Sequence, residues 1–433
     1  MAKPVYEGLK VLDATNNYAG PLAGSMLADY GAEVWHIEKP VLGDDNRFFP
    51  PMIDGISINY CSDNRGKKSV VLDLKDPRGA EIFKKLAAKA DVILESFRPG
   101  VMEKLGLDYE SIRAINPRAI YCSISAYGQT GPYAQRPGDD VIAQAVSGLM
   151  DMTGDPNGPP TKIGPAIGDW MGALNAFGCI GTALYYRSIS GQGQHIDISL
   201  CRTLMWVSAK LDSDITGVRS TRTGNHHINL APYGIFQGSN GQSAIIGALS
   251  AKTWGALCKV MNKPELEADP KFVSNDKRVE NLQTLISVIE GWLKSFEDID
   301  DAVNLLIDAG VPCGKVYNQD DILKDPHYNT CKWFTDMPMA DGMKSVRSRK
   351  FPTDPMEFSA FEPVYKKAPA LGENNVEVIG ELGYSEEEIL AMEKEWEDAF
   401  YTKTKKNECT GFEVLTGIWD PDLISFLNRI GGN

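Results

Sequence analysis

One aspartate lies where it could act as a nucleophile. Asp169 stands in the stretch 162–172, after small and apolar residues and just before a long helical pattern of apolar residues at 170–187. A helix that begins at residue 170 would make Asp169 its N-cap, whose carboxylate binds the free backbone N–H groups of the first turn. Capping is the common role at such a position and catalysis the rarer one. The local sequence leaves both roles open.

Basic side chains recur after successive strand-like segments. Three lysines surround the strand pattern at 66–75, and the pattern at 91–95 leads into a loop that contains Phe97 and Arg98, with Lys104 close behind. The carboxyl ends of strands in an open α/β sheet are the usual place for ligands. We therefore expect a ligand with negative charge at this edge of the sheet.

The elements that must position these residues alternate between strand and helix. Strand patterns fall at 9–13, 32–38, 66–75, 91–95, 119–125 and 195–199, with helical patterns between them. This alternation predicts an α/β domain with an open, mostly parallel sheet. The first turn, 16–24, is not Gly-x-Gly-x-x-Gly, so a dinucleotide fingerprint is absent. Its small residues could admit a nucleotide or pantetheine group, or serve close helix–sheet packing.

Length and composition indicate a globular protein of two domains. The chain has 433 residues and a formal net charge of −14, which weighs against nucleic acid as a partner. It contains no long apolar run, so we expect a cytoplasmic protein without membrane partners. Eight scattered cysteines without ligand spacing predict free thiols and no metal site.

Changes in residue composition and in secondary-structure pattern along the chain predict the domain boundaries. A large domain over 1–212 and a linker over 213–230 precede a smaller α/β domain over 231–316, which contains a hairpin around Asn240 and Gly241. A second linker follows over 317–345. Residues 346–400 are expected to return to the large domain, and 401–433 form a C-terminal extension.

Several motifs occur together and in order. They are GLKVLD at 8–13, GAEV at 31–34, KSVVLDLK at 68–75, ESFRPG at 95–100, YGQTGP at 127–132, GD at 168–169 and GVPC at 310–313. In this ordered set the chain resembles the class III (family III) CoA-transferases. The resemblance implies an open Rossmann-like sheet in the large domain, a smaller α/β domain, and a homodimer of interlocked rings.

The resemblance also implies a function for Asp169. In the family, this aspartate attacks an acyl-CoA thioester and carries a mixed anhydride and then an aspartyl-CoA thioester, before an acceptor acid repeats the steps in reverse. The partners would be an acyl-CoA donor and a carboxylic acid acceptor, with CoA as substrate and no tightly bound cofactor. A helix N-terminus beside Asp169 would keep its carboxylate ionised.

The same resemblance implies which residues contact CoA. They are Tyr18, Ala19, Lys39, Leu72, Lys75, Phe97, Arg98 and Lys104. Lys and Arg among them fit an anionic ligand on an acidic protein. Lys39 and Lys104 stand where some members have Arg, and a lysine binds phosphate as a point charge without a bidentate fork.

Two alternatives share the implied fold. Acyl-CoA racemases resemble this chain, but they carry His-Asp where this sequence has Asp139 and Asp140, and a Glu in the region of 247–250 where this sequence has none. Without that His, the acid/base pair for two-sided proton transfer is missing, and transferase chemistry is favoured. A third hypothesis, after a transferase and a racemase, is a protein that binds CoA without catalysing a reaction.

The acceptor pocket is indicated only by departures from the family pattern. Transferases for oxalate carry a run of glycines where this sequence has 223–233, so we expect a larger acid, such as a carnitine-type betaine, a bile acid or a 2-hydroxy acid. The candidate residues on the substrate side are Tyr127, Gly128, Asp139, His226, His227 and Tyr233.

Overall fold

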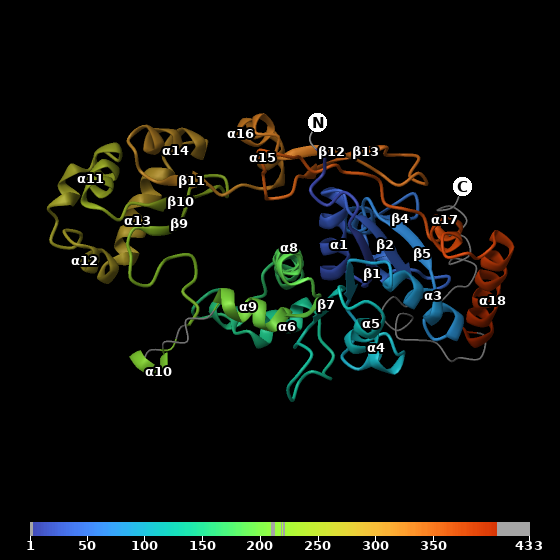
Figure 1. Ribbon diagram of the computed structural model, residues 1–433. Helices are drawn as coiled ribbons and strands as arrows, with labels where there is room; N and C mark the ends of the chain where they lie inside the picture. Colours follow the sequence, from blue (N-terminus) through green and yellow to red (C-terminus); the bar gives the residue numbers. More distant parts are fainter. Residues whose placement is uncertain (1–2, 209–212, 218, 220, 405–433) are drawn as a thin grey trace. The chain divides into compact units, whose positions relative to one another are not determined.

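The computed structural model describes residues 3–208, 213–217, 219 and 221–404 (Figure 1). The chain divides into two compact units. The first comprises Met1–Ser147, Gly164–Ala209 and Lys332–Asn433, and the second comprises Gly148–Ile163 and Lys210–Cys331. Most of the C-terminal extension predicted over 401–433 lies outside the described residues. Among those described, no helix is long and apolar enough to cross a membrane.

The first unit is built on a sheet of six parallel strands. In chain order they are β1 (Lys10–Ala14), β2 (Glu33–Glu38), β5 (Lys68–Val71), β6 (Val92–Glu95), β7 (Ile120–Ser125) and β8 (Gln194–Ser199). Their order across the sheet is β5-β2-β1-β6-β7-β8, and every neighbouring pair is parallel. The predicted α/β fold with a parallel sheet is confirmed. The chain builds outward from β1 in one direction and then restarts at β6 in the other, so the topological switch point lies between these two strands.

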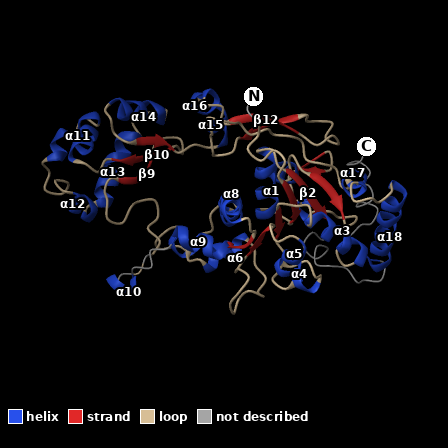
Figure 2. Cartoon of the chain, viewed as in Figure 1, coloured by secondary structure: helices blue, strands red, loops and turns tan. Residues whose placement is uncertain are grey.

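Helices cover both faces of this sheet (Figure 2). Those of the N-terminal part are α1 (Ala19–Asp29), α2 (Ile58–Asp63), α3 (Pro77–Ala87), α4 (Val101–Lys104), α5 (Tyr109–Ile115), α6 (Asp140–Val146), α8 (Ile167–Ser190) and α9 (Leu200–Ser208). α1 packs along α8, and both are rich in small residues. A Cβ added to Gly172 would lie 2.6 Å from a methyl carbon of Leu200. Close packing therefore accounts for at least part of the small-residue pattern.

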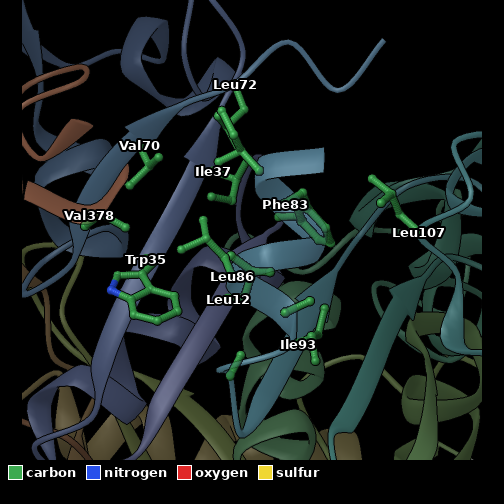
Figure 3. Close-up of a cluster of buried hydrophobic side chains, with 14 of the residues drawn as sticks. Leu12, Trp35, Ile37, Val70, Leu72, Phe83, Leu86, Ile93, Leu107 and Val378 are labelled. Carbon is green, nitrogen blue, oxygen red and sulfur yellow. The ribbon is translucent and has the colours of Figure 1, made fainter. Parts of the chain in front are cut away.

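The C-terminal segment completes the first unit. It contains the hairpin β12 (Phe334–Pro338) and β13 (Ser348–Pro352), then α17 (Asn375–Gly380) and α18 (Glu386–Thr404). Val378 and Trp396 from this segment are buried in the same cluster as Leu12, Trp35 and Phe83, and Figure 3 labels all of these except Trp396. The last described helices are thus part of the core under the sheet. The short elements β3 (Met52–Ile53), β4 (Ile56–Ser57) and η1 (Asp45–Phe48) also belong to this unit.

The second unit has its own small sheet and core. β9 (Tyr233–Gln237), β10 (Ser243–Gly247) and β11 (Cys313–Lys315) form an antiparallel sheet in the order β11-β10-β9. The helices are α7 (Leu149–Met152), α10 (Ser213–Thr216), α11 (Ala251–Val260), η2 (Pro264–Glu267), α12 (Asn275–Glu280), α13 (Leu282–Leu293), α14 (Ile299–Asp308), α15 (Gln319–Lys324) and α16 (Pro326–Thr330). Asn240 and Gly241 both have positive φ in the β9–β10 loop, as the predicted hairpin requires.

A buried charge network holds the turn between β1 and α1. The His36 nitrogens lie 3.3 Å from Asp13 Oδ2 and from Asp44 Oδ2, without the alignment of a standard hydrogen bond, and all three side chains are inaccessible to solvent. Lys67 Nζ contacts Asp13 Oδ2 at 2.7 Å. Asp44 Oδ1 in turn accepts the backbone N–H of Asn17 at 2.9 Å. The network therefore fixes the loop that follows β1 at the carboxyl edge of the sheet.

The imidazole of His36 is expected to be charged in this network. Burial and Lys67 lower its pKa, but Asp13 and Asp44 outweigh them and raise it from 6.5 to about 9. A group with a raised pKa stabilises the fold fully below its unfolded value, and this contribution is lost as pH rises through the folded value. The stabilisation by His36 is therefore lost between pH 6.5 and 9, and the raised pKa corresponds to about 3 kcal/mol in the free energy of unfolding.

We predict that the free energy of unfolding falls more steeply between pH 6.5 and 9.5 in the wild type than in His36→Gln. Buried carboxyl groups titrate in both proteins, so the difference in slope isolates His36. Urea unfolding followed by circular dichroism at each pH measures it. His195→Gln is the matched control, because His195 is exposed, and it should keep the wild-type slope. Equal slopes in the wild type and His36→Gln would contradict the prediction.

Candidate active site

Asp169 lies in the first turn of α8 but does not cap it. The helix begins at Ile167, its N-cap is Ala166, and no side chain of the capping residue bonds the helix. The expected helix start at residue 170 is therefore wrong by three residues, and of the two roles that the sequence left open, capping is not the one that Asp169 has in the structure. The Asp169 carboxylate is left available for another role.

A side chain of α6 accepts the hydrogen bond from the backbone at the start of α8. Asp140 Oδ1 accepts the backbone N–H of Gly168 at 2.6 Å, and Asp140 Oδ2 accepts from Gln144 Nε2 at 2.8 Å. A carboxylate at a helix N-terminus also interacts favourably with the helix dipole. Asp140 thus performs, from a different helix, the task that the sequence suggested for Asp169.

The environment of Asp169 disfavours its charged form. Burial is the largest cause, and the carboxylates of Asp140 and Asp139 add to it, which together raise the pKa of Asp169 to about 7. The expectation that the helix N-terminus keeps this group ionised is not met, because burial and two like charges outweigh the dipole. Perturbed carboxyl groups of this kind cluster at functional sites.

Tyr18 and Ala19 lie beside this carboxyl. Tyr18 is the N-cap of α1, and its ring meets that of Trp170 edge to face with 6.0 Å between centroids. Burial, with Asp63 and Asp169, raises the pKa of the Tyr18 phenol to about 12. Ala19 is the first residue of α1 and lies against α8 near Gly172. The structure therefore brings these two predicted CoA-contacting residues to Asp169.

The switch point of the sheet is bridged by two polar residues that the sequence did not single out. The backbone N–H of Asn16, after β1, donates to Ser96 Oγ, after β6, at 3.0 Å. Ser96 directly follows a predicted strand and Asn16 comes shortly after another, but only the strand order shows that the two strands are neighbours. Phe97 and Arg98 follow at once, half-buried and exposed respectively.

The remaining predicted CoA contacts occupy different environments on the first unit. Lys75, Arg98 and Lys104 are exposed, and no carboxylate oxygen among the described residues lies within 4.0 Å of their charged groups. Lys39 forms an ion pair with Asp45. Leu72 is buried in the core, and its backbone N–H donates to the carbonyl oxygen of Glu38 at 2.9 Å.

The loop after β7 carries Tyr127 and Gly128. Gly128 has φ +88°, its N–H donates to Ser125 Oγ at 3.0 Å, and a Cβ there would lie 3.3 Å from the Asp197 carboxylate. Asp139 caps α6 by accepting the N–H of Ile142 at 3.2 Å. Asp139 therefore has a structural task as well as an electrostatic effect on Asp169.

The other candidates on the substrate side belong to the second unit. His226 forms a β-bridge with Gly234, and its ring packs on Phe236 at 5.0 Å. His227 Nδ1 accepts the N–H of Asn229 at 3.1 Å, and its ring meets Tyr233 at 5.8 Å. The two histidines and Tyr233 form a cluster, and their role in substrate binding stays a prediction. No group of three His, Cys, Asp or Glu side chains in the described ranges could hold a metal ion.

We predict that Asp140→Asn lowers the pKa of Asp169 below 7. The amide removes a like charge but keeps an oxygen that accepts the Gly168 N–H, and burial, the largest cause, holds the pKa above the ordinary value of about 4. A carboxyl carbon-13 NMR titration measures it, with the Asp169 signal identified by its loss in Asp169→Asn. Asp151→Asn, an exchange in the second unit, should leave the titration unchanged. An unshifted Asp169 signal in Asp140→Asn would refute this account of the site.

Comparisons with known proteins place the chain in a family. The family model described as CoA-transferase family III matches residues 6–375. An acetyl-CoA:oxalate CoA-transferase of Acetobacter aceti is 41% identical over 72% of this chain and 81% of its own length, and the human succinyl-CoA:glutarate CoA-transferase is 38% identical over 75% and 74%. The crystal structure of a CAIB/BAIF family protein from Brucella suis covers 88% of this chain and 100% of its own, with 35% identity and a TM-score of 0.79. On these matches the chain belongs to CoA-transferase family III and is a CoA-transferase.

Proposed function

We propose that Asp169 is the nucleophile of this CoA-transferase. The observation that carries the proposal is the free, half-buried carboxyl of Asp169 in the first turn of α8, relieved of capping by Asp140. It lies beside Tyr18, which follows the turn after β1 at the switch point of the sheet. Such a position suits a ligand that enters at the carboxyl ends of the strands.

The proposed reaction proceeds in four steps. The Asp169 carboxylate attacks the thioester carbonyl, the C–S bond breaks, and a mixed anhydride and the CoA thiolate result. The thiolate attacks the aspartyl carbonyl and releases the donor acid, which leaves an aspartyl-CoA thioester. The acceptor carboxylate then attacks this thioester and expels the thiolate again. Finally the thiolate attacks the acceptor carbonyl, which forms the new acyl-CoA and restores Asp169.

The raised pKa of Asp169 fits this chemistry. Only the ionised form attacks, and a carboxylate of higher basicity is the stronger nucleophile. Burial also keeps water from the anhydride, which would otherwise be hydrolysed. For CoA itself, Lys75, Arg98 and Lys104 offer charges at the edge of the sheet that no described carboxylate neutralises.

We further propose that the acids exchanged are dicarboxylic. Oxalate and glutarate, in the names of two relatives, are both dicarboxylic acids. The prediction against oxalate, made from the missing run of glycines, remains untested, and the 41% identity to an oxalate enzyme weighs against it. Oxalate, glutarate, carnitine-type betaines, bile acids and 2-hydroxy acids therefore all belong in the acceptor panel.

The family match favours transfer over the racemase alternative, and the two activities are told apart by a simple test. A racemase would exchange the α-hydrogen of a 2-methylacyl-CoA with deuterated solvent in the absence of any acceptor acid. A silent CoA-binding protein would bind CoA and turn over no donor and acceptor pair.

We predict that an acyl-CoA donor leaves a covalent, hydroxylamine-sensitive adduct on the wild-type protein, and that Asp169→Ala forms none and loses turnover. Intact-protein mass spectrometry and a coupled transfer assay measure the two effects. Asp151→Asn should behave as the wild type. Undiminished transfer by Asp169→Ala would eliminate Asp169 as the nucleophile.

We also predict that the protein is a homodimer. Large apolar side chains on α8 and α9 are unusually exposed, with Tyr185 at 71%, Ile189 at 69% and Trp206 at 82%. Light scattering of the wild type should give twice the mass of one chain. The double variant with Tyr185→Glu and Trp206→Glu should give the mass of a single chain. A wild-type monomer at micromolar concentration would contradict this.

A further inference from the structure

The loop that carries two of the predicted CoA contacts is tied to the strand before it. Phe97 and Arg98 follow β6, and the backbone N–H of Phe97 donates to Glu95 Oε2 at 2.9 Å. Glu95 is the last residue of β6 and is only 4% exposed. The loop is therefore held by a buried carboxyl group as well as by the bond between Asn16 and Ser96.

Glu95 is in turn held by side chains of the next two strands. Ser123 of β7 lies opposite Glu95 in the parallel register, and its hydroxyl hydrogen-bonds to the carboxyl group. Ser123 Oγ lies 2.9 Å from Nε2 of His195 on β8. The His195 ring stacks on Tyr109 of α5, with 5.2 Å between the ring centroids. A chain of contacts thus runs from α5 across β8, β7 and β6 to the backbone of Phe97.

The proton donors in this chain follow from the chemistry of its members. The Ser123 hydroxyl has one proton, and when it donates to Glu95 its oxygen must accept from Nε2–H of His195. Burial lowers the pKa of His195, although Asp197 and Glu110 act against it. A neutral imidazole with its proton on Nε2 therefore completes the chain, and the hydrogen bonds all run toward the Glu95 carboxylate.

No positive charge balances this carboxylate. In the described part of the chain, no nitrogen of a basic side chain lies within 4.0 Å of the Glu95 carboxylate oxygens. Burial raises the pKa of Glu95 to about 7, and Asp197 adds to this effect, whereas the bonds from Ser123 and the Phe97 backbone lower it. The charge of Glu95 therefore changes close to neutral pH.

A cavity of about 390 Å³ adjoins Glu95 and gives protons a path to it. Charged and titratable side chains from each neighbouring element line this cavity. They are Arg98 and Glu103 at α4, Asp108, Tyr109 and Glu110 at α5, Tyr121 on β7 and His195 on β8.

We propose that Glu95 is a positioning residue for CoA, and that its ionised carboxylate holds the backbone of Phe97 where CoA binds. A hydrogen bond to an ionised acceptor is roughly twice as strong as one to a neutral acceptor. CoA should therefore bind more tightly above pH 7, where Glu95 is ionised, than below it. This inference rests on the part of the proposed function that places CoA at this loop, and not on the reaction at Asp169.

Calorimetric titration with CoA alone, at several pH values from 6 to 8.5, tests the proposal. Glu95→Gln keeps an oxygen for the Phe97 N–H but carries no charge at any pH. We expect its Kd for CoA to exceed that of the wild type about tenfold at pH 8.5 and only about twofold at pH 6. The phosphates of CoA titrate equally with both proteins, so the ratio of the two Kd values isolates Glu95.

Ser123→Ala provides a second readout. It removes the hydroxyl that lowers the pKa of Glu95, so CoA binding should begin to weaken at a higher pH than in the wild type. Glu110→Gln is the matched control, because Glu110 lines the same cavity but is exposed and pairs with Arg113 at 3.1 Å. Its Kd should stay within about twofold of the wild-type value at each pH.

The possible failures are distinguishable. A Kd ratio that does not change with pH would assign Glu95 a purely structural role and overturn the proposal, as would an unchanged Kd in Glu95→Gln. Repulsion between Glu95 and anionic CoA would make the variant bind more tightly at high pH, which would also contradict it. Labelling of Asp169 by an acyl-CoA is measured separately, and its absence would remove the nucleophile without altering the result for CoA binding.

Discussion

The hydrogen bond from the Gly168 backbone to the Asp140 carboxylate is the interaction on which the candidate site depends. In it, a side chain outside the helix accepts a backbone N–H from the first turn of α8. Asp169 is therefore not needed as the cap of this helix. It also places a second carboxylate near Asp169, which raises the pKa of that group. This contact therefore leaves the proposed nucleophile free of capping, and Asp140 adds to the effect of burial on its pKa.

The surroundings of this contact are held by charges buried beneath the sheet edge. His36, Asp13 and Asp44 fix the turn that leads to Tyr18, and Asn16 ties this turn to Ser96 across the switch point. The basic residues at the edge remain exposed. Buried charges are thus paired with one another under the sheet edge, and exposed basic side chains lie at the edge itself, although the total charge of the protein is strongly negative.

The sequence predicts the regular parts of this arrangement well. Alternating strand and helix patterns predicted the parallel sheet, and Asn240 and Gly241 predicted the hairpin between β9 and β10. The start of α8 was misplaced because its acceptor, Asp140, lies 28 residues away in the chain. Ser96 was missed for the same reason, since only the strand order brings it near the end of β1. Local pattern identifies elements, whereas contacts between distant segments decide which side chain is free to react.

The first unit is completed by its last described segment, which supplies Val378 and Trp396 to the core. During synthesis, the ribosome releases the helix that carries Asp169 well before this segment. A nascent chain would then hold the aspartate without the finished core of its unit. The proposed nucleophile therefore acquires its finished surroundings only after residues more than 200 positions further along the chain, Val378 and Trp396, have joined the core.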